Sequence, residues 1–108
     1  LPSSTDDLLA VNATAPSAFA LKGNYPNPFN PTTAIEFSLP ASGNAALDVY
    51  SVTGQRVRTL IDGPLAAGRH SVEWNGYDDS GAPVSSGVYI ARLRAGSNSA
   101  AHRMMFMK

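Results

Sequence analysis

Hydrophobic and polar positions alternate along most of the chain after the first 18 residues, as expected for β-strands with one buried face. The stretch TAIEFSLP shows this most clearly, with Ile35, Phe37 and Leu39 on one face and Glu36 and Ser38 on the other. The next stretch, AALDVYSV, directs alternate residues inward in the same way. This period of two predicts strands rather than helices.

Glycine- and asparagine-rich segments separate the alternating stretches and predict turns between them. Thr53-Gly54 interrupts the alternation between residues 45–52 and 55–61, and Gly54 permits a positive φ in the turn of that hairpin. Residues 62–68 are expected to form a loop, residues 75–87 a long turn segment, and residues 96–98 a tight turn. Strands are predicted at residues 19–22, 33–40, 45–52, 55–61, 69–75, 87–95 and 99–108.

About seven short strands without a convincing helix predict an all-β fold, an antiparallel immunoglobulin-like β-sandwich, with a small barrel as the alternative. Trp74, the single tryptophan, lies on an alternating apolar face and is the best core candidate. The inward positions expected to surround it are Phe37, Leu47, Val49 and Leu93.

Residues 23–33, GNYPNPFNPTT, contain three prolines, which exclude a helix and a central strand. We expect this segment to be a stiff cover at the domain boundary, in which Tyr25 and Phe29 tuck into the sandwich and the asparagines cap turns. Residues 1–18 are poor in apolar side chains and are interpreted as a linker from an upstream cargo domain, with the folded domain at residues 19–108.

The formal net charge is zero, which gives no indication of a nucleic-acid partner. Charge is nevertheless uneven, because all eight acidic residues lie at or before Asp79, while Arg92, Arg94, Arg103 and Lys108 follow it. The chain has no cysteine, which excludes disulfides and thiolate chemistry, and no apolar run approaches the ~20 residues of a transmembrane helix.

Residue patterns for catalysis are absent from the sequence. His70 is expected to be a partly buried structural residue and His102 a surface residue, and no serine elbow or carboxylate pair accompanies them. We therefore predict no enzyme activity and no cofactor. Asn75, Asp78 and Asp79 form an oxygen-rich loop that is a weak calcium candidate, although such residues are also typical of a tight turn.

Several motifs resemble a known family when they are taken in order. They are NYPNPFNPTTAIEFSLP, then VYSVTGQRVRTLIDGPLAAGRHSVEWNGYDDSGAPVSSGVYIARL, and a short basic tail. The order resembles that of type IX secretion system C-terminal sorting domains (type A) of Bacteroidetes and related phyla. It is also similar to the Ig-like domain of flagellar hook-capping proteins. The resemblance covers about residues 19–108.

The resemblance implies a non-catalytic sorting signal on an exported protein, which passes through the periplasm to the cell surface or medium. The implied partners are the type IX translocon, a sortase-like surface protease and the cargo in the same chain, and the domain is expected to be a monomer. The family's recognition features correspond to Gly87, Tyr89, Gly96, Arg103 and Lys108. Many members carry a lysine near the start of the last strand, whereas this chain has Arg103 as its only strong cation there before Lys108.

Two further functions remain open at this point. The domain could be a cell-attachment or carbohydrate-binding accessory module of a secreted glycoside hydrolase, or a structural Ig-like spacer. A sorting signal would present the basic residues and the backbone edge of the last strand to a receptor. An attachment module would instead bind cells or glycans by itself.

Overall fold

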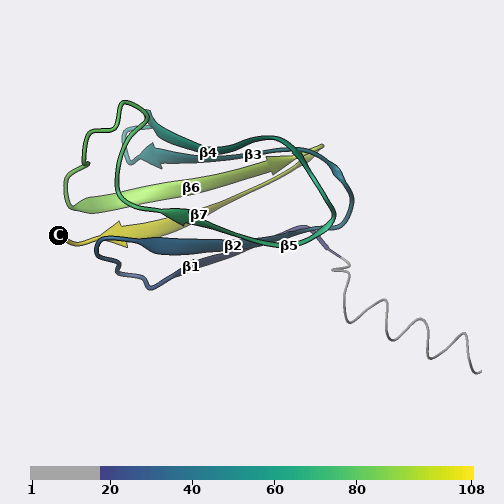
Figure 1. Ribbon diagram of the computed structural model, residues 1–108, viewed down its shortest axis with the longest axis horizontal. Helices are drawn as coiled ribbons and strands as arrows, with labels where there is room; N and C mark the ends of the chain where they lie inside the picture. The colour runs from purple at the N-terminus through teal and green to yellow at the C-terminus, as the bar shows by residue number, and fades with distance from the viewer. Residues whose placement is uncertain (1–17) are drawn as a thin grey trace, which may run out of the picture.

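The computed structural model describes residues 18–108, and they form seven β-strands in two layers (Figure 1). The predicted linker lies outside the described residues except for Ala18. The strands are β1 (Ala20–Tyr25), β2 (Thr33–Leu39), β3 (Gly43–Ser51), β4 (Arg56–Leu65), β5 (Gly68–Trp74), β6 (Gly87–Ala95) and β7 (Asn98–Phe106). The sequence-based prediction of an all-β Ig-like sandwich is therefore confirmed.

The strands form a three-stranded sheet in the order β1-β2-β5 and a four-stranded sheet in the order β4-β3-β6-β7, and all neighbours within them are antiparallel. The register between β3 and β6 is continuous and places Leu47 beside Leu93 and Val49 beside Ala91. Because side chains alternate along a strand, this register directs those four side chains into the space between the sheets.

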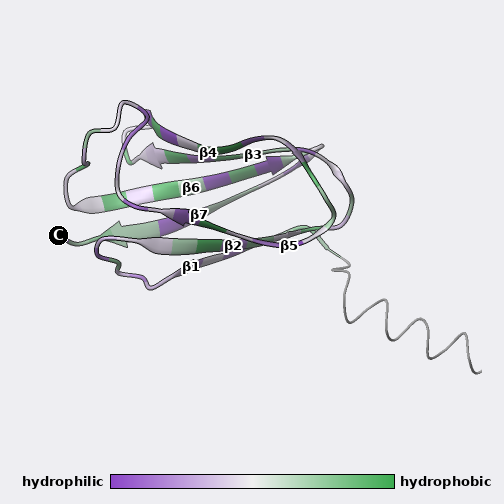
Figure 2. Ribbon diagram, viewed as in Figure 1, coloured by the Kyte–Doolittle hydropathy of each residue, from purple (hydrophilic) through white to green (hydrophobic). Residues whose placement is uncertain are grey.

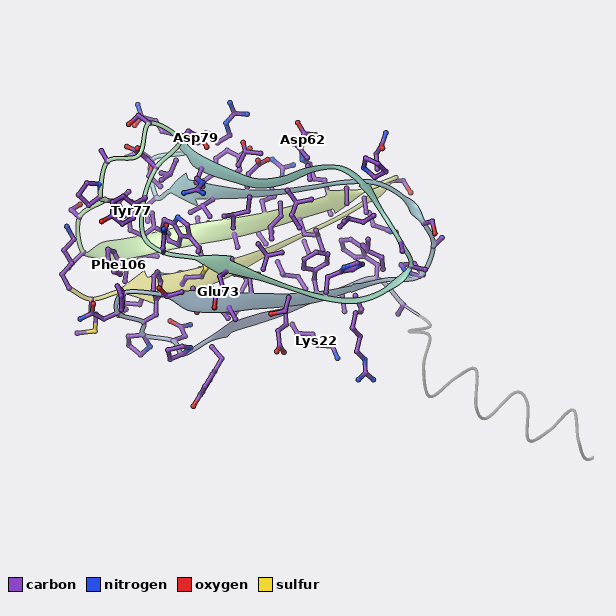
Figure 3. All side chains as sticks on the ribbon, in the orientation of Figure 1. Lys22, Asp62, Glu73, Tyr77, Asp79 and Phe106 are labelled. Carbon is purple, nitrogen blue, oxygen red and sulfur yellow. The ribbon has the colours of Figure 1, made fainter. Side chains whose placement is uncertain are left out.

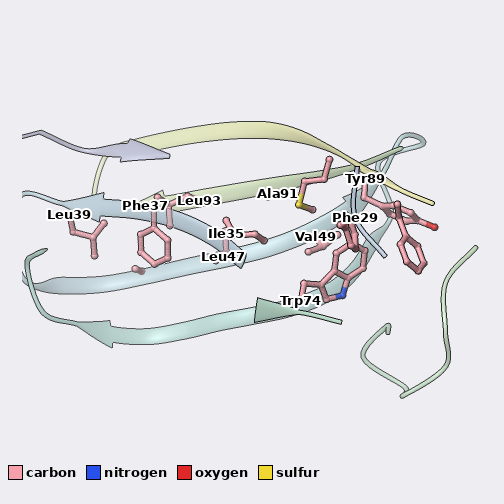
Figure 4. Packing of buried hydrophobic residues seen from close by; sticks show 13 residues of the cluster. Phe29, Ile35, Phe37, Leu39, Leu47, Val49, Trp74, Tyr89, Ala91 and Leu93 are labelled. Atoms are coloured by element: carbon pink, nitrogen blue, oxygen red, sulfur yellow. The ribbon is translucent and has the colours of Figure 1, made fainter. Parts of the chain in front are cut away.

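The core fills the space between the two sheets along their length (Figure 4). All five side chains that the sequence places there are buried, with exposed fractions of 1% or less: Trp74, Phe37, Leu47, Val49 and Leu93. Trp74 lies at the end of β5 and contacts the aromatic rings at one end of the sandwich. Burial of these apolar side chains is the main favourable term in folding such a domain.

The prediction of a loop over residues 62–68 is wrong for most of this segment. Strand β4 continues through Asp62-Gly63-Pro64 to Leu65, and β5 begins at Gly68. Pro64 is compatible with this strand because β4 lies at the edge of its sheet, where a residue without a backbone N–H is tolerated. The added residues pair with β3 in continuous register, and the two register shifts lie nearer the start of β4, opposite Leu47–Asp48 and Val49–Tyr50, so that part of the strand is bulged.

Two outward-directed polar side chains are buried, contrary to simple alternation. Ser38 is buried because it lies under the chain at Ala18, whose carbonyl oxygen accepts a hydrogen bond from Ser38 Oγ at 3.3 Å. Asp48 is buried beneath Arg94, whose Nη2 lies 3.3 Å from Asp48 Oδ2. Each therefore has a polar partner that compensates for its burial.

Candidate recognition site

The five sequence-predicted recognition residues lie along the β6–β7 hairpin but not in one cluster. Gly87 begins β6 and pairs with Phe106 near the end of β7, and the Lys108 backbone N–H donates to Ser86 Oγ at 2.9 Å. Gly96 lies in the turn at the opposite end of the hairpin, with φ +60°. The length of β6 separates the two ends by roughly 25–30 Å.

Tyr89 contributes to this hairpin from inside the core. Its side chain is only 7% exposed, and its ring packs edge-on against Trp74 with the centroids 5.3 Å apart. Its hydroxyl donates a hydrogen bond to the Ser85 carbonyl oxygen at 2.7 Å. Tyr89 therefore stabilises the start of β6, whereas Arg103 and Lys108 are exposed.

The proline segment covers the outer edge of β7 near its end (Figure 1). The Phe29 N–H donates to the Met105 carbonyl oxygen at 2.9 Å, and the Met107 N–H donates to the Phe29 carbonyl oxygen at 3.0 Å. The side chain of Asn27 continues this pairing through Arg103 and Met105. The expectation that the last strand presents a free backbone edge is therefore wrong for this part of β7.

Phe29 fixes the segment by inserting its ring among other aromatic side chains. It stacks on Phe106 with the centroids 4.9 Å apart and lies 5.5 Å from the Trp74 ring. By contrast, Tyr25 is 81% exposed, so the prediction that both aromatic residues of the segment tuck into the sandwich is right only for Phe29. Phe106 ends β7, so the last strand and the proline segment depend on the same cluster.

Gly76 leaves the space that Phe106 occupies. It has a φ of +79°, and a Cβ placed on it would lie 3.0 Å from Phe106 Cζ. The adjacent Trp74 donates its indole N–H to the Tyr77 carbonyl oxygen at 2.9 Å. The sequence W-N-G therefore encodes both a left-handed turn and the contact surface for the last strand.

The oxygen-rich loop uses its carboxylates to hold its own backbone. Asp78 Oδ1 accepts hydrogen bonds from the Ser80 hydroxyl at 2.6 Å and from the backbone N–H groups of Ser80 and Ala82, each at 2.9 Å. The Ser80 hydroxyl first, and the Ala82 N–H next, lower the pKa of the Asp78 carboxyl below its ordinary value. These contacts are those of a capped turn.

The other calcium candidates also make local contacts. Asp79 Oδ1 accepts from the Thr59 N–H at 3.0 Å and lies 3.9 Å from Arg58 Nε, and Asn75 Oδ1 accepts from the Tyr77 N–H at 3.3 Å. Asp79 and Tyr77 lie at the same end of the sandwich as Phe106 (Figure 3). Residues 18–108 contain no group of three or more histidine, cysteine or carboxylate side chains arranged to hold a metal ion.

Both histidines have structural contacts. His70 is half-buried, as predicted, and stacks on Phe37 with the centroids 5.2 Å apart. The prediction that His102 is a surface residue is wrong, because its ring packs over Gly23 and its Nε2 lies 3.1 Å from Asn24 Oδ1. Gly23 makes room for the ring, so His102 of β7 contacts β1 across the side of the sandwich.

A hollow of about 720 Å³ lies between the turn after β3 and the loop before β6. Ser51, Ser80 and Ser85 line it together with Arg56 and Asp79, but neither histidine of the chain does. A serine without a positioned base is not a competent nucleophile.

Within the described part of the chain, no helix is long and apolar enough to cross a membrane.

Comparison with known proteins gives one matching family and several matching solved structures, among them those of two bacterial proteins. The family model described as the FlgD Ig-like domain matches residues 23–99. No curated protein matches the sequence.

The crystal structure of FlgD from P. aeruginosa superposes with a TM-score of 0.52 at 29% identity, over 68% of this chain and 58% of that one. This chain thus spans a little over half the length of that relative. The crystal structure of dimeric latent PorU from Porphyromonas gingivalis superposes with a TM-score of 0.59 at 15% identity, over 77% of this chain and 9% of that one. At this identity the similarity shows the fold alone.

Proposed function

We propose that this chain, which belongs to the FlgD Ig-like domain family, is a non-catalytic secretion and sorting signal. It would direct an attached exported protein through the type IX outer-membrane translocon to the cell surface or the medium. Membership of this family supports the description of the chain as an Ig-like module. The assignment to type IX sorting is our own and rests on the order of the motifs and on the contacts of the last strand.

The observation that carries the proposal is the exposure of two basic side chains on and just after a last strand whose backbone is paired on both sides. Arg103 and Lys108 are exposed, whereas Met104 and Phe106 between them are buried in the core. Strand β6 pairs with one edge of β7, and the proline segment pairs with the other near Met105. A receptor would therefore meet Arg103 on a backbone that is already paired, with little backbone ordering entropy to lose on binding.

The remaining predicted partners belong to the same proposal. A sortase-like surface protease that releases the cargo would cut before the folded domain, within residues 1–18. The cargo protein would precede that segment. The domain itself would contribute recognition and no chemistry.

An attachment or carbohydrate-binding module is less well supported by the arrangement of tyrosines. Sugar-binding surfaces present aromatic faces together, but Tyr25 and Tyr77 are exposed on different segments and Tyr89 is buried in the core. Tyr50 is half-buried on β3. The tyrosines thus offer no common platform.

The proposal is tested by fusing residues 1–108 to a reporter with a signal peptide in a host that has a type IX translocon. The fusion should reach the surface or medium, and the double variant Arg103→Glu/Lys108→Glu should stay in the periplasm although it still folds. Arg69→Glu, on an exposed position of β5, is the matched charge-reversal control.

A wild-type fusion that stays in the periplasm contradicts the sorting function. Export of the double variant at the wild-type level contradicts the role of the two cations. If the purified domain instead binds cells or glycans, the attachment function replaces this proposal.

A further inference from the structure

The outer faces of the two sheets differ in composition. Strands β1, β2 and β5 expose a balanced mixture of charges: Lys22, Glu36, Arg69 and Glu73 (Figure 3). The four-stranded sheet instead exposes arginines on β6 and β7 beside apolar side chains. A face of mixed charges is typical of a solvated surface. A face of arginines beside apolar side chains requires a different explanation.

Four apolar side chains lie together on the outer face near the end of β7. The register pairs Tyr50 with Ile90 and Val88 with Met105, and the alternate residues of these strands are buried in the core. Met105 is 43% exposed, and the other three are half-buried. Along β6, Figure 2 shows no strongly hydrophilic position near the start of the strand and two of them towards its end, where the arginines lie. We name Tyr50, Val88, Ile90 and Met105 the outer apolar patch.

Arginines surround the outer apolar patch on three strands. Arg103 pairs with Ile90 in the register of β6 and β7, and Arg56 pairs with Tyr50 on the other side. Arg92 follows on β6, beyond Ile90. Within residues 18–108, no carboxylate lies within ion-pair distance of these three guanidinium groups. The acidic side chain nearest in the register, Asp48, is buried and already contacts Arg94.

A shallow hollow beside the patch could receive a side chain. It has a volume of about 270 Å³ and is lined by Asn27, Pro28, Val88 and residues 103–105. This volume is below the ~300–1,000 Å³ of small-molecule pockets, so a side chain of a protein partner fits it better than a ligand. The proline segment thus forms one wall of the hollow, next to the cation that the sorting proposal uses.

We propose that this face docks on a protein surface that carries carboxylates around an apolar side chain. Tyrosine, methionine and arginine are enriched in protein interfaces, whereas lysine and glutamate, which the patch and its border lack, are depleted. The arginines give the complementary charge for an acidic partner and would steer its approach. This inference rests on the proposed sorting function, in which the partner is the outer-membrane translocon, and it names the face that the translocon contacts.

Site-specific photo-crosslinking in the type IX-competent host tests the contact directly. A benzoylphenylalanine at position 105 of the full fusion should crosslink to a translocon protein, whereas the same group in place of Ser71, on the other outer face, should not. Arg92→Glu should lower export about tenfold, as expected for loss of one interface charge, while Arg69→Glu leaves it within about twofold. Thermal unfolding of each variant verifies that the domain still folds.

The outcomes separate this inference from the sorting function. If the wild-type fusion is exported but position 105 gives no crosslink and Arg92→Glu exports normally, the docking face is overturned and the sorting function stands. A crosslink from position 105 to lipid or lipopolysaccharide, in place of protein, also overturns it. If the wild-type fusion is not exported, both proposals fall together.

Discussion

The side-chain amide of Asn27 pairs with the backbone of Met105, which lies 78 positions later in the sequence. Its Oδ1 accepts the Met105 N–H at 3.0 Å, and its Nδ2 donates to the neighbouring Arg103 carbonyl oxygen at 3.4 Å. Pro28 has no N–H to offer, and backbone pairing resumes at Phe29. An asparagine side chain therefore supplies the edge pairing that a proline-rich backbone lacks.

Replacing Asn27 should weaken this edge. We expect Asn27→Ala to lower the free energy of unfolding by about 1 kcal/mol, because two exposed hydrogen bonds are lost. Urea denaturation measures the change. Asn30→Ala is the matched control, since Asn30 also precedes a proline but its side chain makes no hydrogen bond to residues 18–108. Equal effects of the two substitutions would contradict the edge-pairing role.

Alanine at Gly76 should cost more than alanine at Gly96. Both glycines have left-handed φ values, of +79° and +60°, which cost an alanine about 1–2 kcal/mol. At Gly76 the new Cβ also meets Phe106 Cζ at 3.0 Å, whereas at Gly96 it meets open space. We expect the clash to add about 1–3 kcal/mol in chemical denaturation. A smaller loss at Gly76 than at Gly96 would show that the Phe106 ring moves aside freely.

Trp74 anchors the aromatic cluster at the end of the sandwich. Trp74→Ala should lower the free energy of unfolding by about 3–5 kcal/mol, because it removes a buried ring against which Phe29 and Tyr89 pack. Trp74→Phe should cost less, since an aromatic ring remains to contact Phe29 and Tyr89, while the hydrogen bond to the Tyr77 carbonyl oxygen and part of the ring volume are lost. Circular dichroism in guanidinium chloride distinguishes these values, and equal losses would show that the phenyl ring supplies none of the stabilisation.

Acid should loosen the loop that Asp78 caps. Its pKa is lowered in the folded state by the Ser80 hydroxyl and then by the Ala82 N–H, so folding favours the carboxylate. This stabilisation is fully present above the ordinary pKa of 3.8 and is lost as pH falls through the lower folded value. Asp78→Asn should therefore flatten the decline in thermal stability below about pH 4. Identical profiles for the wild type and Asp78→Asn would contradict this account.

Much of the fold could be predicted because most strands have one face in the core, so that hydrophobic periodicity records their position. Residues 33–39 and 87–95 show this directly. The end of β4 could not be predicted, because Asp62-Gly63-Pro64 has the composition of a turn. It forms a strand only because its partner β3 continues beside it, which is a non-local cause.

The candidate site was less accessible to sequence reasoning. Arg103 and Lys108 could be singled out by charge, but the pairing of Asn27 with β7 joins segments at opposite ends of the domain. The predicted role of His102 failed for the same reason, because its contact with Gly23 and Asn24 crosses between the sheets. The asparagines that precede prolines indicate side-chain hydrogen bonds in this segment. The sequence does not show that the partner of Asn27 is β7, which only the structure identifies.

The most direct test of the sorting function compares two hosts that differ only in the type IX translocon. A signal peptide, a fluorescent reporter and residues 1–108 are expressed in both, and the protease-accessible fraction of the reporter at the cell surface and in the medium is measured. The account predicts reporter outside the competent cells and periplasmic reporter in the deficient cells. Equal distribution of the reporter in the two hosts would contradict it.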